Sequence, residues 1–221
     1  MEPSVAMREY LAEIYRLQED NPTVSTTALA ERLDVSAPAV PRMLRRLRNA
    51  GYISHEPYHG FFLTELGIEE ALKELRRHRI LEVFLVDVME FTWEEAHEHA
   101  DDLGKGLNDN VVARMALMTN NPSRCPHGEP IPDEDGILPE IEDVCIINLS
   151  VGAKGEVSRV RTHDPEKLKY FASLKLTPGM GFEIVGRAPF NGPMRLRIDR
   201  DEIVLGAELT KSLWVATEVK A

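Results

Sequence analysis

The stretch SAPAVPRMLRRLRNAG, Ser36–Gly51, decides the fold of the first part of this chain. It predicts a helix from about Pro38 to Asn49, because proline is tolerated at a first helical position and Gly51 follows as a stop signal. Four arginines lie on this helix and no acidic residue does, although the whole chain has a formal net charge of −11. A basic helix in an acidic chain predicts a local contact with a polyanion.

The segments around this helix complete a recognisable arrangement. Residues 4–20 have apolar side chains at helical spacing, and a short second helix is expected at 28–33 after a Ser or Thr cap. Two strands, 52–56 and 61–63, flank a turn and read as a hairpin. Three helices followed by a hairpin predict a winged helix-turn-helix, which we expect to occupy residues 1–73.

In a helix-turn-helix the second helix of the motif enters the major groove of DNA, with its N-terminal residues at the base edges. Arg42, near that end, is expected to bond guanine, and the later arginines are expected to hold phosphates. Apolar residues beside Arg42 could instead contact thymine methyl groups, and a merely solvated basic face remains an alternative. The candidate DNA contacts are Ser36, Pro38, Ala39, Pro41, Arg42, Arg45, Arg46, Arg48, Tyr58 and His59.

The remainder of the chain predicts an α+β protein of three parts. Helices at about 65–88, 92–107 and 109–118 carry apolar stripes, and leftover apolar surface would suit a homodimer interface. After a Pro- and Gly-punctuated linker, short β runs and one helix at 165–174 predict a small β-barrel. We therefore expect a helical domain at 74–143 and the barrel at 144–221. The expected strands are 144–149, 156–161, 181–185, 194–198, 203–205 and 214–219.

Composition limits the cellular setting. The chain has 221 residues, of which 43% are hydrophobic and 29% charged, as in soluble globular proteins. No apolar run reaches the length of a membrane span and the N-terminus lacks a signal core, so a cytoplasmic protein without membrane contact is expected. Its two cysteines are too few for a disulfide framework.

The stretch CPHGEPIP, Cys125–Pro132, places a thiol and an imidazole two residues apart between stiffening prolines. Both are ligands for a transition-metal ion. His78 and Glu82 share a helix face, and His97 and Asp101 have the same four-residue spacing on the next helix. Each feature also has a plain alternative: a proline-rich loop, or a salt bridge within a basic helix face. Together they predict a site for a first-row divalent ion.

With these features, the chain resembles the metalloregulators of the diphtheria-toxin-repressor and manganese-transport-regulator family. The resemblance is carried by Tyr10–Tyr15, His78–Glu82 and Cys125–Pro132. Leu174–Gly179 is similar to the SH3-like ferrous-transport-A domain of the longer members. The resemblance implies a winged helix, a helical dimerisation domain and an SH3-like barrel. It also implies a repressor that binds a double-stranded, palindromic DNA operator as a homodimer.

The resemblance also implies ligands. One site would be formed by Glu82, Cys125, His127 and, from the barrel, Asp164, with His163 and Glu166 as rivals for that last position. His78 and His97 match imidazoles at or beside this site. A second site would use Glu9 and Asp101. There the chain departs from the family pattern, with Gly104 and Lys105 where an acid and a histidine are expected, although His99 or Asp102 could compensate.

The expected function is thus control of metal homeostasis by a repressor whose corepressor is Mn²⁺ or Fe²⁺. The ligand types alone do not choose the metal, because a thiolate would also accept Zn²⁺ or other divalent ions in vitro. No enzymatic role is expected. Three alternatives stay open: a thiol redox regulator that senses through Cys125, a small metallohydrolase, and a barrel that binds a partner protein instead of tuning the site.

Overall fold

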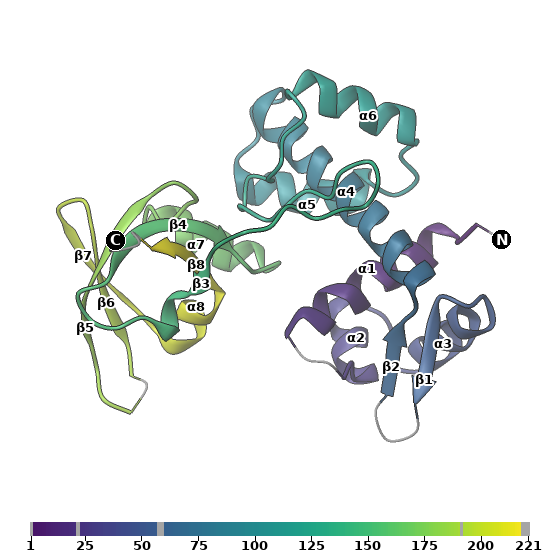
Figure 1. The fold of residues 1–221 in the computed structure, drawn as a ribbon, viewed down its shortest axis with the longest axis horizontal. Helices are drawn as coiled ribbons and strands as arrows, with labels where there is room; N and C mark the ends of the chain where they lie inside the picture. The colour runs from purple at the N-terminus through teal and green to yellow at the C-terminus, as the bar shows by residue number, and fades with distance from the viewer. Residues whose placement is uncertain (1, 21–22, 57–59, 191, 218–221) are drawn as a thin grey trace. The chain divides into compact units, whose positions relative to one another are not determined.

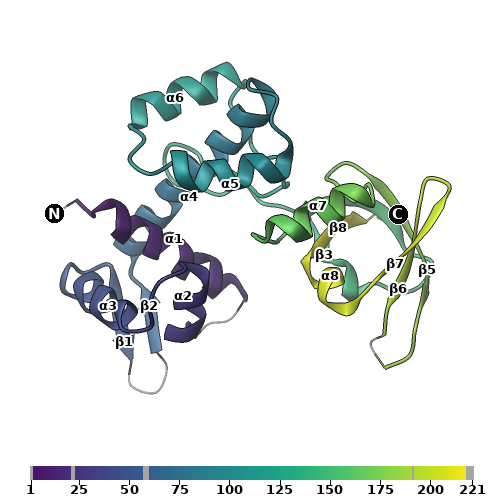
Figure 2. The same ribbon diagram turned by 180° about the vertical axis from the view of Figure 1, so that it is seen from behind.

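The computed structural model describes residues 2–20, 23–56, 60–190 and 192–217. Contacts within the chain (Figures 1 and 2) divide it into two compact units. The first unit consists of residues 1–78, 105–108 and 132–137, and the second of 79–104, 109–131 and 138–221. The long helix α4 contributes residues to both units, and the division at 73/74 and 143/144 stays a prediction.

The first unit contains the winged helix-turn-helix expected from the sequence. Helix α3 begins at Ala39, directly after Pro38 and one residue later than expected. Helix α2 begins at Thr26, earlier than expected, because the Ser25 hydroxyl accepts a hydrogen bond from the Ala28 N–H, 3.0 Å away. Its elements are α1 (Val5–Asp20), α2 (Thr26–Arg32), α3 (Ala39–Asn49), the hairpin strands β1 (Ile53–Glu56) and β2 (Gly60–Leu63), and the first part of α4 (Glu65–Asp87).

Helix α3 is amphipathic, and this decides which face it offers to solvent. Val40, Leu44 and Leu47 are buried at helical spacing in the core of the unit, packed with apolar residues of α1 and α2. The hairpin is held to α4 at Gly67, where a Cβ atom would stand only 2.0 Å from the carbonyl oxygen of Tyr52. The arginine face of α3 is therefore left on the surface beside an anchored hairpin.

The helical part of the second unit comprises the end of α4, α5 (Trp93–Leu103) and α6 (Asp109–Met118). A capping box starts α5, with the Thr92 N–H donating to the Glu95 carboxylate across 3.0 Å. Helix α5 was expected to reach residue 107 but ends at Leu103. Gly106 adopts a φ of +86°, which an α-helix does not accommodate.

The rest of the second unit is a six-stranded antiparallel sheet in the order β3-β8-β4-β5-β6-β7, consistent with the expected SH3-like barrel. The first expected strand is much shorter than predicted, because the chain turns after Cys145 into a 3-10 helix, η1 (Ile146–Asn148). The helix α8 (Ala207–Ser212) was not predicted. The strands are β3 (Val144–Cys145), β4 (Lys154–Val160), β5 (Gly181–Arg187), β6 (Met194–Ile198), β7 (Asp201–Leu205) and β8 (Leu213–Thr217), and α7 spans Pro165–Ser173.

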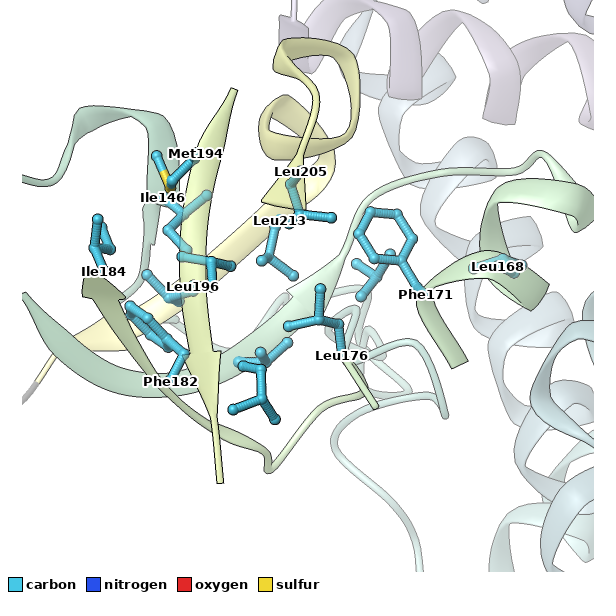
Figure 3. Close-up of a cluster of buried hydrophobic side chains, with 14 residues drawn as sticks. Ile146, Leu168, Phe171, Leu176, Phe182, Ile184, Met194, Leu196, Leu205 and Leu213 are labelled. Carbon is cyan, nitrogen blue, oxygen red and sulfur yellow. The ribbon is translucent and has the colours of Figure 1, made fainter. Parts of the chain in front are cut away.

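The core of this sheet is a continuous apolar cluster (Figure 3). Strand β6 alternates buried and exposed residues, so that Met194, Leu196 and Ile198 point inward. Phe171 of α7 is fully buried in the same cluster. Burying a side chain of this size contributes roughly 1.5–3 kcal/mol, so the barrel has a core of its own.

Candidate metal centre

Three buried side chains gather between α4 and the loop after α6. Glu82, Cys125 and His127 each offer one ligand atom, and these atoms lie within 4.8 Å of one another. Their exposed fractions are only 2%, 6% and 4%, respectively. Burying a carboxylate, a thiol and an imidazole together costs free energy unless the groups find a partner. A divalent cation can bind all three.

The orientation of the His127 ring suits metal binding. Its Nε2–H donates to the carbonyl oxygen of Trp93 across 3.0 Å, which leaves Nδ1 facing Glu82 Oε1 at 3.4 Å and Cys125 Sγ at 3.8 Å. Metal-binding histidines commonly anchor their second nitrogen on a carbonyl in this way. The separations between donors suit one ion held at about 2.0–2.3 Å from each. The residues present therefore fit a divalent ion.

The surroundings of the cluster favour the protonated forms of His127 and Cys125. Burial alone lowers the pKa of His127, but the neighbouring Glu82 carboxylate and Cys125 reverse this and raise it to about 10. Burial, and after it the charge of Glu82, raises the pKa of the Cys125 thiol above its ordinary value. A metal ion that binds here consequently displaces protons from both groups.

Two further histidines extend the cluster. His97 Nδ1 lies 2.7 Å from Glu82 Oε1, and His97 Nε2 lies 3.2 Å from Nδ1 of His163. His163 precedes α7, so the barrel supplies an imidazole to this row of groups. His78 belongs to the first unit and lies one helical turn before Glu82 on α4.

The three candidates from the barrel differ in position. Asp164 is exposed, and its carboxylate caps α7 by accepting from the Glu166 and Lys167 N–H groups at 3.0 and 3.4 Å. Glu166 is also exposed and forms an ion pair with Lys169 at 2.9 Å. In this conformation His163 is the one that reaches the cluster, through His97. Asp164 is directed instead to the helix end.

Within the described residues, no group of three candidate ligands contains a residue that was expected at the second site. Glu9 is half-buried on α1 of the first unit. Asp101 is exposed on α5 of the second unit, as are His99 and Asp102. A Cβ on Gly104 would approach the Ala100 carbonyl oxygen to 2.7 Å, so this position also has no room for a side chain without a shift.

The candidate DNA contacts lie largely on one exposed surface of the first unit. Ala39 is half-buried, and Tyr58 and His59 fall outside the described residues. A pocket of about 250 Å³ lies between α3 and the hairpin, lined in part by Pro41, Arg45, Arg48 and Phe61. The other candidates are exposed: Ser36, Pro38, Pro41, Arg42, Arg45, Arg46 and Arg48.

Sequence reasoning missed three residues that lie beside the candidate metal centre. The Trp93 ring stacks on His127 with centroids 5.1 Å apart, in addition to its carbonyl contact. Glu129 and Arg159 form ion pairs directly beside the loop. Trp93 carried no signal beyond its place after a helix cap. Glu129 lay within the motif already noted, but its partners are far away in the sequence.

Both cysteines are free and buried. Cys145 donates weakly to carbonyl oxygens of α8 and is remote in sequence from the cluster. Within the described residues, no helix combines the length and the hydropathy needed to cross a membrane.

Three family models match successive parts of the chain. Residues 4–61 match the N-terminal DNA-binding domain of the iron-dependent repressors, and residues 64–133 match their metal-binding and dimerisation domain. Residues 146–217 match the FeoA domain. The three matches follow the order of modules expected from the sequence.

Individual proteins agree with these matches. An uncharacterized HTH-type transcriptional regulator of Methanocaldococcus jannaschii is 37% identical over 52% of this chain and 93% of its own length. The iron-dependent repressor IdeR of Mycobacterium tuberculosis is 35% identical over 64% of this chain, and the match spans 63% of IdeR, just under two thirds.

A solved manganese-dependent transcriptional repressor, in complex with manganese, superimposes with a TM-score of 0.90. It is 33% identical, and the match covers 96% of this chain and 100% of that one. The chain therefore belongs to the iron-dependent repressor family of metal-dependent transcriptional regulators, in a form with a C-terminal FeoA domain.

Proposed function

We propose that this protein is a transcriptional repressor whose DNA binding is stimulated by Mn²⁺ or Fe²⁺. The single observation that carries the proposal is the buried Glu82–Cys125–His127 cluster, with donor atoms within 4.8 Å of one another, in a chain that also carries a winged helix-turn-helix. Both metals come from the names of similar proteins, one iron-dependent and one manganese-dependent.

In this proposal a bound cation neutralises the cluster and fixes the positions of its donor groups. Glu82 brings the carboxylate from α4, while Cys125 and His127 bring a thiolate and Nδ1 from the loop. His97 holds Glu82 through the 2.7 Å contact, and His163 supports His97. His78 and Asp164 are kept as further candidate ligands, and Asp164 would need a rearrangement to reach the ion, because its carboxylate caps α7.

Metal and DNA are coupled by linkage. If the ion binds better to the conformation that fits the operator, then DNA raises metal affinity by the same factor as metal raises DNA affinity. The thiolate favours Zn²⁺ over Mn²⁺ in intrinsic affinity. Discrimination in favour of Mn²⁺ or Fe²⁺ would then depend on coordination geometry and on the cellular supply of each metal.

The DNA-binding surface is the exposed face of α3. Arg42, near the N-terminus of α3, is proposed to read a base, and Arg45, Arg46 and Arg48 are proposed to contact phosphates. A homodimer would place two such helices in successive major grooves of a palindromic operator. A repressor has to reach the chromosome, which agrees with the cytoplasmic location expected from the sequence.

A second copy of the chain is the proposed partner of the helical part of the second unit. Large apolar side chains are exposed there, including Leu117 at 59% and Met118 at 56% of their full accessibility. Apolar surface of this kind marks interfaces. Val88, Met89, Leu103 and Val111 are exposed in the same part of the chain.

The alternatives are less well supported. A thiol sensor needs an accessible thiolate, whereas Cys125 is buried and its pKa is raised by that burial. A metallohydrolase would leave the basic helix α3 and the hairpin without a role. We therefore propose no enzymatic activity for this chain.

The test is a set of DNA-binding titrations with Mn²⁺, Fe²⁺ and Zn²⁺, on an operator found by unbiased selection. Specific binding that needs a divalent ion supports the proposal. Specific binding that persists in a chelator, or that responds to peroxide and not to metal, would contradict it.

A further inference from the structure

The loop that carries Cys125 and His127 is bound to strand β4 of the barrel by an unusual concentration of charged side chains. We propose that Glu129 and Arg159 are positioning residues, which hold the two loop ligands in place for the metal ion. The inference rests on the proposed metal-dependent function. It assigns to the barrel a role at the metal centre that does not depend on its donating a ligand.

The loop is a tight structure in itself. The Gly128 N–H donates to the Cys125 carbonyl across 2.8 Å, and the Cys125 N–H donates to the Glu129 carbonyl across 2.9 Å. Gly128 has a φ of +85°, and a Cβ there would stand 2.1 Å from the carbonyl oxygen of Ser158. The loop therefore lies directly against β4, at a distance that only glycine allows.

Strand β4 is irregular at the point of contact. Val157 pairs with Val215 and Arg159 pairs with Trp214, so Ser158 is an extra residue, a β-bulge. Val157 and Val160 are both buried although they are three residues apart, which strict alternation would not permit. The bulge restores the inward direction of Val160, and it leaves Ser158 and Arg159 together on the loop side.

Backbone and side-chain hydrogen bonds join the two surfaces. The Val160 N–H donates to the carbonyl oxygen of His127 across 2.9 Å. Arg124 donates to the hydroxyl of Ser158 at 2.9 Å and to its carbonyl oxygen at 3.3 Å. The main chain of one proposed metal ligand is thus bonded to the barrel.

Charge then concentrates around Glu129, two residues after His127. Its carboxylate lies 3.4 Å from Arg79 of α4, 3.3 Å from Arg159 and 3.6 Å from Arg161. Arg79 also donates to the carbonyl oxygen of Pro130. One carboxylate therefore connects the helix that carries Glu82 with the strand that supports the loop.

Arg159 is itself fixed from the other side. It forms a two-pronged pair with Asp143 at 2.9 and 3.1 Å, and the Asp143 side chain is only 1% exposed. The guanidinium groups of Arg159 and Arg161 lie 4.7 and 5.2 Å from the centre of the Trp214 ring. A guanidinium held at this many points has little freedom to move, so it defines the position of Glu129.

These contacts predict an effect on metal binding as well as on stability. Removing either partner of the Glu129–Arg159 pair, whose side chains are only 14% and 13% exposed, removes a link between the loop and β4 and lets the loop move away from the strand. Such movement displaces Cys125 and His127 from Glu82. Residues that orient metal ligands typically change metal affinity by about 10- to 100-fold when they are replaced.

The experiment compares Arg159→Met and Glu129→Gln with wild type and with Arg197→Met. Arg197 is a matched control, because it also lies on a barrel strand and pairs with two acids, Glu183 and Glu202, but on an exposed surface. Mn²⁺ affinity is measured by titration of the full-length protein. The absorption spectrum of the Co²⁺-substituted protein reports the thiolate and the ligand geometry, which a general loss of stability would not alter.

The expected result is an Mn²⁺ affinity at least ~10-fold weaker, with a changed Co²⁺ spectrum, in both positioning variants and not in Arg197→Met. The double variant should lose less than the sum of the two single losses, because both substitutions remove the shared Glu129–Arg159 contact. Unchanged affinity and spectrum in Glu129→Gln, with wild type binding Mn²⁺ normally, would overturn the inference even if Arg159→Met fails to fold. If wild type and Glu82→Ala bind Mn²⁺ equally, the proposed function itself is wrong.

Discussion

The imidazole of His127 stacks on the indole of Trp93 and also donates to the carbonyl oxygen of the same residue, 3.0 Å from its Nε2. One residue at the start of α5 thus determines both the plane of the His127 ring and the nitrogen that faces Glu82. Trp93 is therefore a natural place to test how strongly the orientation of one ligand matters.

Trp93→Phe should keep Mn²⁺ affinity close to that of wild type, because the carbonyl and an aromatic ring remain. Trp93→Ala should weaken it by about 2- to 10-fold, which corresponds to the roughly 0.5–1.5 kcal/mol of an aromatic pair. Calorimetric titration measures both. Equal affinities for the phenylalanine and alanine variants would show that stacking has no influence on the site.

Metal binding should depend on pH with a definite sign. The pKa of His127 is raised to about 10 in the metal-free protein, and that of Cys125 is raised as well, so both carry protons near neutral pH. Mn²⁺ must displace them, and its apparent affinity should rise with pH between about 6 and 8.5. Titrations in buffers of different ionisation enthalpy measure the protons released.

The same pKa value predicts the opposite trend for the metal-free protein. An unfolded histidine loses its proton near pH 6.5, whereas folded His127 keeps it to about pH 10. The stability that the His127–Glu82 pair provides is fully present below pH 6.5 and is lost as pH rises to about 10. Melting in EDTA should show this decline for wild type and a smaller one for Glu82→Gln.

The three buried ligands should be individually necessary. Glu82→Ala, Cys125→Ala and His127→Ala should each abolish or strongly weaken metal-stimulated DNA binding, because the two remaining donors hold a divalent ion poorly. Circular dichroism checks that the fold is retained. Asp164→Ala should have a milder effect, since its carboxylate caps α7 in the structure, and His163→Ala is its comparison. A normal metal response in all three primary variants would mean that the ion binds elsewhere.

Arginines of α3 should separate into two groups. Arg42→Ala should relax preference at one base position, at a cost of roughly 1–3 kcal/mol. Arg46→Ala should weaken binding to all sequences alike and lower the salt slope by ~0.9. Competition assays against operators changed at single positions, repeated at several salt concentrations, distinguish the two. Identical effects of both substitutions would contradict these assignments.

Each subunit should bind one Mn²⁺ ion tightly. Gly104 offers no side chain and Lys105 introduces a positive charge where a second ion would need ligands. Calorimetry should find any further Mn²⁺ only at clearly higher concentration, and Lys105→His should strengthen that weaker step. Two tight ions per subunit in wild type, neither affected by Glu82→Ala, would place the site elsewhere.

The sequence predicted the helices and the winged arrangement well, because these follow from local spacing. Val40, Leu44 and Leu47 repeat at helical intervals, and α5 begins at Trp93, one residue from its expected start. Predictions failed where the backbone changes direction within a few residues. The end of α5 before Gly106, the 3-10 turn after Cys145 and the unpredicted α8 are such cases.

The candidate site was predictable in part for the same reason. His127 and Cys125 are neighbours in the sequence, and His78 and Glu82 share a helix face. By contrast, the contact of His97 with His163 joins residues 66 positions apart. The ion pair of Glu129 with Arg159 spans 30. No pattern in a single sequence indicates pairs at such separations, and only the folded chain shows that His163 contacts His97 while Asp164 caps α7.

The close approach of Gly128 to Ser158 has a consequence for how such chains can be recombined. The family models meet in the segment between residues 133 and 146, which makes that segment look like a natural joint for exchanging C-terminal modules. A chimera joined there would place a foreign strand, with its own bulge or none, opposite this loop. A segment that can be exchanged between such proteins therefore has to include residues 124–131 together with the barrel. A chimera that receives the barrel without this loop, or the loop without the barrel, should fold but respond poorly to metal.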